Sequence, residues 1–247
     1  MNGRGWSPKK LDGCVLWIRA SAGVSLSGSD ITGIADQSGR GNDVVANGTP
    51  QLVSNAIGTM PGIALAGADG RYLKNASVQL VGANAARHAF GVGKGVAGAG
   101  GSYTAGGGSF LSTSTSTSTS VGRWSFLTSR VTESSVYGDT QAGNVTTNPA
   151  EVLNGLSMVA DLAYIGGTGD NKLTYNLNGT QKTLTLNANA YTEPNTPGFT
   201  VGADANYPAY RWAGYLCEVL LFNRVLSTIE ADTVRRYFGA IYGITIP

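Results

Sequence analysis

The segment 211–244 constrains the fold most, because it joins a nearly continuous apolar run to an amphipathic helix. Between Gly214 and Phe222 the apolar run is interrupted by Glu218, and such runs are typical of a strand that is buried on both faces. Ser227 and Glu230 then form a Ser-x-x-Glu capping box, which predicts that a helix starts there. The helix is therefore expected to cover a β core.

The helix after the capping box has one apolar face and a charged remainder. Glycine at position 239 offers a stop or a kink. The charged residues Asp232, Arg235 and Arg236 are expected to lie away from the apolar face. That face is predicted to consist of Ile229, Val234, Tyr237, Phe238 and Ile241.

Short strand patterns recur along the rest of the chain, separated by turn residues. The segment 11–20 contains an unbroken apolar run, 61–73 is interpreted as a hairpin-like element with an Asp69-Gly70 turn, and Asn178-Gly179 is a strong hairpin turn. This spacing predicts an all-β fold, a two-sheet antiparallel jelly-roll sandwich, with one C-terminal α-helix. Further strands are expected at 87–92, 124–131, 156–164, 173–177, 183–186 and 199–201.

Composition excludes several classes of function. A net charge of +2, with no basic cluster beyond Lys9-Lys10 and Arg235-Arg236, predicts no binding to nucleic acid. No apolar run approaches the ~18 residues of a membrane span, so no membrane insertion is expected.

The N-terminus lacks the apolar core of a signal peptide, which predicts retention in a cytosol. Cys14 and Cys217 are expected to be small buried hydrophobic residues in a reducing compartment.

The chain is expected to form a single domain over 1–247, with a Gly/Ser/Thr-rich insertion at about 91–120. Gly93, Gly95 and Gly98 match G-x-G-x-x-G, but more glycine follows where a nucleotide site needs a helix N-terminus. The alternating Ser/Thr run 112–120 is compatible with an exposed hairpin arm or with a flexible spacer.

Five segments together resemble the laminin-G-like, concanavalin A-like lectin/glucanase jelly roll. They are LWIRAS at 16–21, DQSGRGND at 36–43, MPGIALAGADGRYL at 60–73, FTVGAD at 199–204, and WAGYLCEVLLFNRVLSTIE at 212–230, followed by YGI at 242–244. The resemblance covers nearly the whole chain and implies the jelly-roll fold rather than an activity. The sequence departs from it at Arg19, where such domains often carry an acidic residue, and in the glycine-rich insertion.

Enzymes of this superfamily are β-glucan hydrolases, and the resemblance raises that activity as one alternative. A retaining glycosidase needs two carboxylates ~5 Å apart, usually from one strand as E-x-D-x-x-E. The nearest match, Glu230 to Arg235, ends in arginine and lies on the predicted helix. Glu218 lacks a local carboxylate partner and is expected to be a buried hydrogen-bonding residue. His88 is the single histidine, and without a G-x-S-x-G motif it is interpreted as structural.

The resemblance also implies a possible calcium site. Lectin-like jelly rolls often hold calcium in Asp/Asn loops, so Asp36, Asn42 and Asp43 are candidate ligands, although turn formation explains the same residues. Asp69 and Asp204 offer further oxygen ligands. No other cofactor is expected.

The best candidate for a ligand-binding site is the loop 206–212. Tyr207, Tyr210 and Arg211 offer a stacking and hydrogen-bonding surface for sugars, whereas Trp212 is interpreted as a core residue.

These observations favour a non-enzymatic structural or adhesive protein of a bacteriophage virion, such as a capsid decoration or a tail-associated protein. Its expected partners are other virion proteins or copies of itself, with cell-surface glycans as further ligands, and its expected location is a virion assembled in the host cytoplasm. The first alternative is a carbohydrate-binding lectin module without a virion role. The second is a glycoside hydrolase, which the absence of a paired carboxylate motif disfavours.

Overall fold

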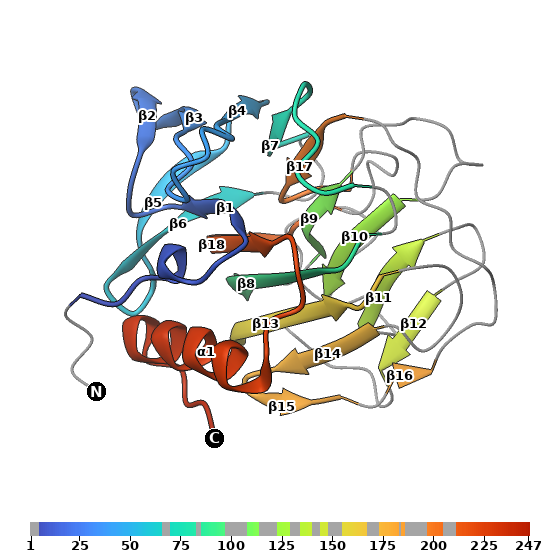
Figure 1. Ribbon diagram of the computed structural model, residues 1–247. Helices are drawn as coiled ribbons and strands as arrows, with labels where there is room; N and C mark the ends of the chain where they lie inside the picture. The colour runs from blue at the N-terminus through green and yellow to red at the C-terminus, as the bar shows by residue number, and fades with distance from the viewer. Residues whose placement is uncertain are drawn as a thin grey trace.

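The computed structural model describes residues 5–65, 70–82, 85–96, 108–113, 123–128, 134–139, 144–147, 155–166, 173–182, 184–185, 197–204 and 211–247. The described strands are antiparallel and form two layers, and a C-terminal α-helix packs against one of them (Figure 1). The predicted β-sandwich with one C-terminal helix is therefore confirmed.

The first sheet is built around strand β18 (Gly214–Phe222), which is buried along nearly its whole length, as its apolar run predicts. β18 pairs with β1 (Cys14–Arg19) on one edge and with β8 (Arg87–Gly95) on the other. The sheet continues from β8 through β13 (Ser157–Tyr164), β14 (Leu173–Leu177) and β15 (Thr180–Gln181). The first and last long strands of the chain are thus neighbours.

The second sheet faces the first. Its strands follow the order β2 (Val24–Ser27), β3 (Asp30–Ile34), β4 (Val44–Asn47), β7 (Tyr72–Asn75), β17 (Phe199–Val201), β9 (Gly108–Thr113), β10 (Arg123–Thr128), β11 (Ser134–Asp139), β12 (Asn144–Thr147) and β16 (Leu184–Thr185). The hairpin of β5 (Gln51–Ile57) and β6 (Met60–Leu65) joins the first sheet through the start of β18.

Two apolar clusters hold these layers together. The cluster between the sheets includes Leu16, Leu73, Val201 and Leu216. The second cluster lies on the outer face of the first sheet and is covered by α1 (Thr228–Tyr242). Because a helix with one apolar face must bury it, α1 covers the sheet as the sequence predicts.

The capping box forms at the start of α1. The Glu230 amide donates to Ser227 Oγ at 3.3 Å, and the Ser227 amide donates to the Glu230 carboxylate at 2.9 Å. Arg224 also holds this carboxylate, with its Nη2 2.6 Å from Oε1. A short 3₁₀ turn, η1 (Pro8–Lys10), precedes β1 on the same side of the molecule.

Two predictions about α1, for Ile229 and Arg235, were wrong, and the structure excludes the stop that was one of the two alternatives at Gly239. The helix does not end at Gly239 but continues to Tyr242, and Gly243 caps it with a φ of 66°. Glycine is required at 239 because a Cβ there would lie 2.7 Å from the Ile244 carbonyl oxygen. Ile229 is 80% exposed, and Arg235 is buried, because a carboxylate of the sheet lies beneath the helix at that position.

The predicted hairpin over 61–73 was also wrong, because β6 and β7 belong to different sheets. The Asn178-Gly179 hairpin is confirmed, with φ of 49° and 78° between β14 and β15. No α-helix among the described residues is long and apolar enough to span a membrane.

Candidate functional site

The predicted metal ligands lie together beside β1 and bond to the protein itself. Asp36 Oδ1 accepts the Trp17 amide at 2.8 Å, and Oδ2 accepts the Asn42 amide at 3.1 Å. The Ser38 hydroxyl donates to the same Oδ2 at 2.6 Å. Asp43 Oδ1 accepts the Asp36 amide at 2.8 Å. Both oxygens of Asp36 are therefore already hydrogen-bonded.

This loop closes a sheet edge. Among the described strands β1 pairs only with β18, so its other edge would present unpaired backbone groups. Asp36 satisfies the Trp17 amide, while the Asn42 side chain donates to the Val15 carbonyl at 2.7 Å. The described residues contain no group of three His, Cys, Asp or Glu side chains placed to hold a metal ion. The structure thus gives the loop a structural role, and calcium there stays a prediction.

The predicted sugar-binding loop is described only at its end. Tyr207 and Tyr210 lie outside the described residues, as do Asp69 and most of the 91–120 insertion. Arg211 is half-buried and forms an isolated β-bridge with Ala203. Trp212 is fully buried, with its ring 4.2 Å from that of Phe110, which confirms it as a core residue.

The second sheet carries a row of one apolar and three polar residues, called the polar row below, on its outer face. Residues paired directly across antiparallel strands share one face, and the row Ala46, Leu73, Val201 and Leu111 points into the apolar cluster between the sheets. The neighbouring row has the opposite orientation because side chains alternate along a strand. It consists of Val45, Lys74, Thr200 and Ser112.

The outer row is exposed at β4, where 56% of Val45 is accessible, and buried at Thr200 and Ser112. Next to Val45, Lys74 Nζ donates to Asn47 Oδ1 at 3.1 Å, and Asn47 Nδ2 donates to the Gly70 carbonyl at 2.8 Å. A Cβ added to Gly70 would lie 4.0 Å from both Asn47 Nδ2 and Arg211 Nη1. Arg211 is therefore close to the exposed end of the polar row. We call the residues Asn47, Gly70, Lys74 and Arg211 the β4–β7 corner.

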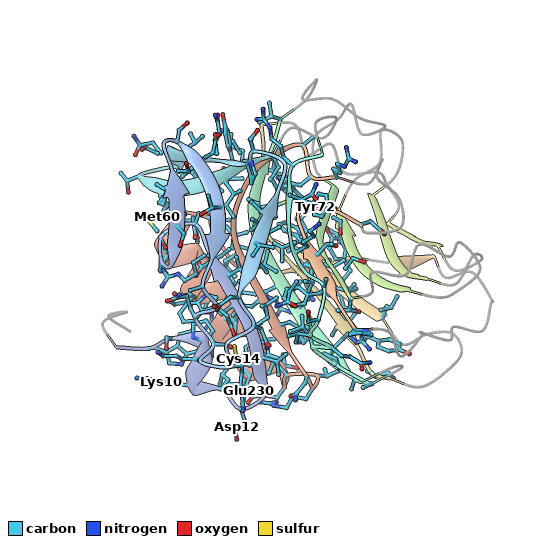
Figure 2. All side chains as sticks on the ribbon, turned by 90° about the horizontal axis from the view of Figure 1, so that it is seen from above. Lys10, Asp12, Cys14, Met60, Tyr72 and Glu230 are labelled. Atoms are coloured by element: carbon cyan, nitrogen blue, oxygen red, sulfur yellow. The ribbon has the colours of Figure 1, made fainter. Side chains whose placement is uncertain are left out.

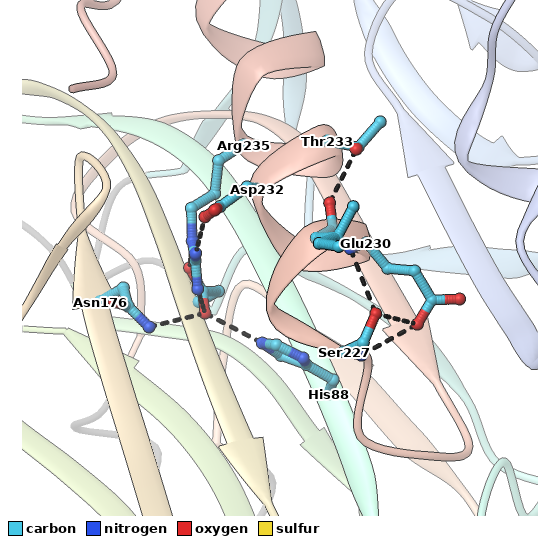
Figure 3. Close-up of polar contacts among 9 residues, drawn as sticks. His88, Asn176, Ser227, Glu230, Asp232, Thr233 and Arg235 are labelled. Carbon is cyan, nitrogen blue, oxygen red and sulfur yellow. Dashed lines mark hydrogen bonds and ion pairs between the residues drawn. The ribbon is translucent and has the colours of Figure 1, made fainter.

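A buried ionic network lies on the other side of the molecule, between the first sheet and α1 (Figure 3). Asp161 Oδ1 accepts from His88 Nε2 at 2.9 Å and from Asn176 Nδ2 at 3.1 Å. Arg235 donates to both Asp161 oxygens, at 2.7 and 2.9 Å, and binds Asp232 at 2.6 Å. The network joins β8, β13, β14 and α1, and it gives His88 the structural role that the sequence predicts.

Glu218 forms a second buried network. Its carboxylate accepts from Trp17 Nε1 at 2.8 Å and from the Tyr242 hydroxyl at 3.0 Å, and Arg19 Nε lies 2.7 Å away. Burial raises the pKa of Glu218 despite the opposing effects of Arg19 and of the hydrogen bonds from Trp17 and Tyr242. The predicted role of Glu218 as a buried hydrogen-bonding residue agrees with these contacts. Arg19, where the sequence departs from the domains it resembles, is its ion-pair partner.

The charged networks offer little for catalysis. Asp161 and Glu218 are at most 1% exposed, and their partners among the described residues are buried or half-buried side chains of the sheet and of α1. His88 Nδ1 has no hydrogen-bond partner in the structure as described, so the His88–Asp161 pair does not extend to a nucleophile there.

Sequence reasoning missed several of these residues. Asp161 carries the same signal as Glu218, an acid inside an apolar strand, and could have been found. Arg235 could not, because its partner is 74 positions away. Asn47 and Lys74 carry no local signal for the same reason.

Comparison with known proteins finds no matching family model. It also finds no matching curated protein. Similar solved structures do exist. Domain 4 of AbnA, an extracellular GH43 arabinanase from Geobacillus stearothermophilus solved in complex with arabinotriose, is 12% identical with a TM-score of 0.55, over 90% of this chain and 98% of that one.

Two further structures are similar over most of this chain. The receptor-binding domain of botulinum neurotoxin C/D mosaic serotype is 13% identical with a TM-score of 0.54, over 95% of this chain and 55% of that one. Trypanosoma rangeli sialidase is 14% identical with a TM-score of 0.51, over 94% of this chain and 33% of that one. This chain thus spans about half of the toxin domain and a third of the sialidase. At this identity the likeness shows the β-sandwich fold.

Proposed function

We propose that this protein is a non-enzymatic binding module of the lectin type that contacts glycans through the second sheet. The observation that carries the proposal is the unequal covering of the two sheets. α1 covers the outer face of the first sheet, whereas the outer row of the second sheet is exposed at Val45 of β4, beside the half-buried Lys74. The predicted loop 206–212 ends beside this exposed part, at Arg211.

The fold neighbours support this proposal. One of them, the arabinanase domain, was solved with arabinotriose, and it matches nearly from end to end. The toxin neighbour is a receptor-binding domain. A lectin-like sandwich that presents one polar face is consistent with both.

The placement of the buried acids supports a non-enzymatic role. A retaining glycosidase needs two carboxylates that both reach one sugar. Asp161 and Glu218 are instead buried beneath α1, and each is hydrogen-bonded to structural partners. Among the described residues, these two acids therefore do not form a hydrolytic pair, and we expect no hydrolysis of oligosaccharides.

A glycan array tests the proposal. We expect the protein to bind a subset of glycans, and Tyr207→Ala combined with Tyr210→Ala to weaken binding about tenfold or more, because aromatic rings stack on sugar C–H faces. Ile229→Ala is the matched control, since Ile229 is exposed on α1 away from the second sheet. An array without any bound glycan, or release of sugar products during incubation, would contradict the proposal.

We further propose that the module is displayed on a bacteriophage virion, as a decoration or tail-associated protein. The low charged content of 13% and the 36 glycines support this setting. Mass spectrometry of purified particles is expected to detect the chain. Its presence in cellular fractions alone would overturn the virion role and leave the glycan proposal untouched.

A further inference from the structure

We infer that the β4–β7 corner is a subsite for an anionic sugar, such as a uronic acid or a sulfated sugar. The inference rests on the proposed glycan binding and adds its ligand class and its residues. The corner lies far from the start of α1, as the positions of Tyr72 and Glu230 show (Figure 2). Its four members come from segments separated by up to 164 positions, so the fold alone brings them together.

Lys74 provides a cation that has no counter-ion among the described residues. Its ammonium group contacts the neutral Asn47 side chain, at 3.1 Å, and it forms no ion pair within the part of the chain that the structure describes. Lys74 is half-buried beside the exposed Val45, so its ammonium group can reach a ligand on the outer face of the sheet. An ammonium group has three donors, and Asn47 takes one of them. Two donors and a full positive charge are left for a ligand.

Asn47 fixes the orientation of the corner. Its Oδ1 accepts from Lys74 and its Nδ2 donates to Gly70, so the amide has one defined orientation and one N–H left to donate. Lys74 is likewise held in place before any ligand arrives. Because the side chains are already ordered, binding costs less conformational entropy.

Gly70 leaves room at the centre of the corner. It has a φ of 69°, and a Cβ at this position would still lie 4.0 Å from Asn47 Nδ2 and Arg211 Nη1. The Asn47 amide and the Arg211 guanidinium therefore both lie within reach of the same point beside Gly70. An arginine and a lysine flanking a neutral amide suit a carboxylate or sulfate with adjacent sugar hydroxyls. Tyr72, which pairs with Asn47, adds an aromatic residue to the same face of the sheet.

The test compares glycans that differ in charge alone. Binding is measured by titration calorimetry against a glucuronate-containing oligosaccharide, its carboxyl-reduced neutral form, and a sulfated form of the same chain. We expect the neutral form to bind about tenfold more weakly than the better of the two anionic forms, and added salt to reduce this difference. Comparison of the two anionic forms identifies which anion the corner prefers.

Lys74→Gln is expected to lower the affinity for the anionic glycan about tenfold and to leave the affinity for the neutral glycan unchanged, because glutamine removes the charge but keeps a side chain of similar length. Asn47→Asp is also expected to lower the affinity for the anionic glycan, because its carboxylate, 3.1 Å from Lys74 Nζ, would neutralise the lysine charge. Asn47→Asp also removes the Nδ2 donor to the Gly70 carbonyl, so unchanged binding of the neutral form is the readout that separates the loss of free charge from a disturbed corner. Lys9→Gln is the control, as Lys9 is exposed in η1.

Equal binding of all three glycans, unaffected by Lys74→Gln, would overturn the anionic subsite and leave the proposed lectin function standing. Failure of every glycan on the array would overturn both. A loss of neutral and anionic binding together in Lys74→Gln would also overturn the subsite, because the charge would then not be what is recognised.

Discussion

Asp161 illustrates how a single residue can join distant elements. Burial alone would raise its pKa, but hydrogen bonds from Arg235 and His88 outweigh burial and lower the pKa below its ordinary value. Because the folded-state pKa lies below the unfolded one, ionised Asp161 contributes stability above the unfolded pKa of about 3.9. That contribution is lost as the pH falls through the lower, folded-state value.

Asp161→Asn is expected to lower the free energy of unfolding by about 3–5 kcal/mol at pH 7, since it leaves Arg235 buried without its carboxylate. Urea denaturation measures this loss, which should shrink as the pH falls below about 4, because the unfolded chain takes up the proton there while the folded carboxyl stays ionised down to its lower pKa. A loss that does not change with pH would show that packing, not charge, explains it.

Glu218→Gln is the matched comparison, because Glu218 is equally buried but has a raised pKa. A group whose pKa is higher in the folded state than in the unfolded state contributes stability below its unfolded-state pKa. This contribution is lost as the pH rises through the folded-state pKa. Glutamine resembles the protonated form and keeps an acceptor for Trp17. We therefore expect a smaller loss at pH 7, about 1 kcal/mol, which does not shrink towards acid pH. Equal losses in both variants would contradict this difference.

At the scale of elements, the Asp36–Asp43 loop replaces a missing neighbour for β1. Asp36→Ala removes the acceptor of the Trp17, Ser38 and Asn42 amides and is expected to cost about 3 kcal/mol. Hydrogen exchange should show faster exchange of the Trp17 amide. Asp30→Ala is the control, since among the described residues the Asp30 carboxylate accepts only from the Gln51 side chain, at 3.2 Å. A melting temperature that depends on calcium in wild type but not in Asp36→Ala would instead reveal a calcium site.

Local signals predicted the elements well. The capping box at Ser227 and the Asn178-Gly179 turn need only neighbours within a few positions, so the sequence determines them. The hairpin predicted over 61–73 failed because its two strands find partners far along the chain. The β4–β7 corner was missed for the same reason, since Asn47 and Lys74 meet only through the pairing of β4 with β7.

At the scale of the whole molecule, the layer between α1 and the first sheet contains both cysteines, Cys14 from β1 and Cys217 from β18. Both are free and buried, in agreement with the sequence interpretation. Burial raises the pKa of each thiol to about 12, so the reactive thiolate hardly forms at pH 8. The layer must therefore open before either cysteine can react.

We expect the native protein to resist alkylation by iodoacetamide at pH 8, and to take up two labels once denaturant unfolds it. The two cysteines should react at the same rate at low denaturant, because Trp17 and Glu218 connect β1 to β18 and Tyr242 connects both to α1. Mass spectrometry of peptides containing Cys14 or Cys217 measures the two rates separately. Faster labelling of Cys14 would show that β1 detaches from the sheet on its own, which would place the weakest part of the sandwich at its Asp36-capped edge rather than beneath the helix.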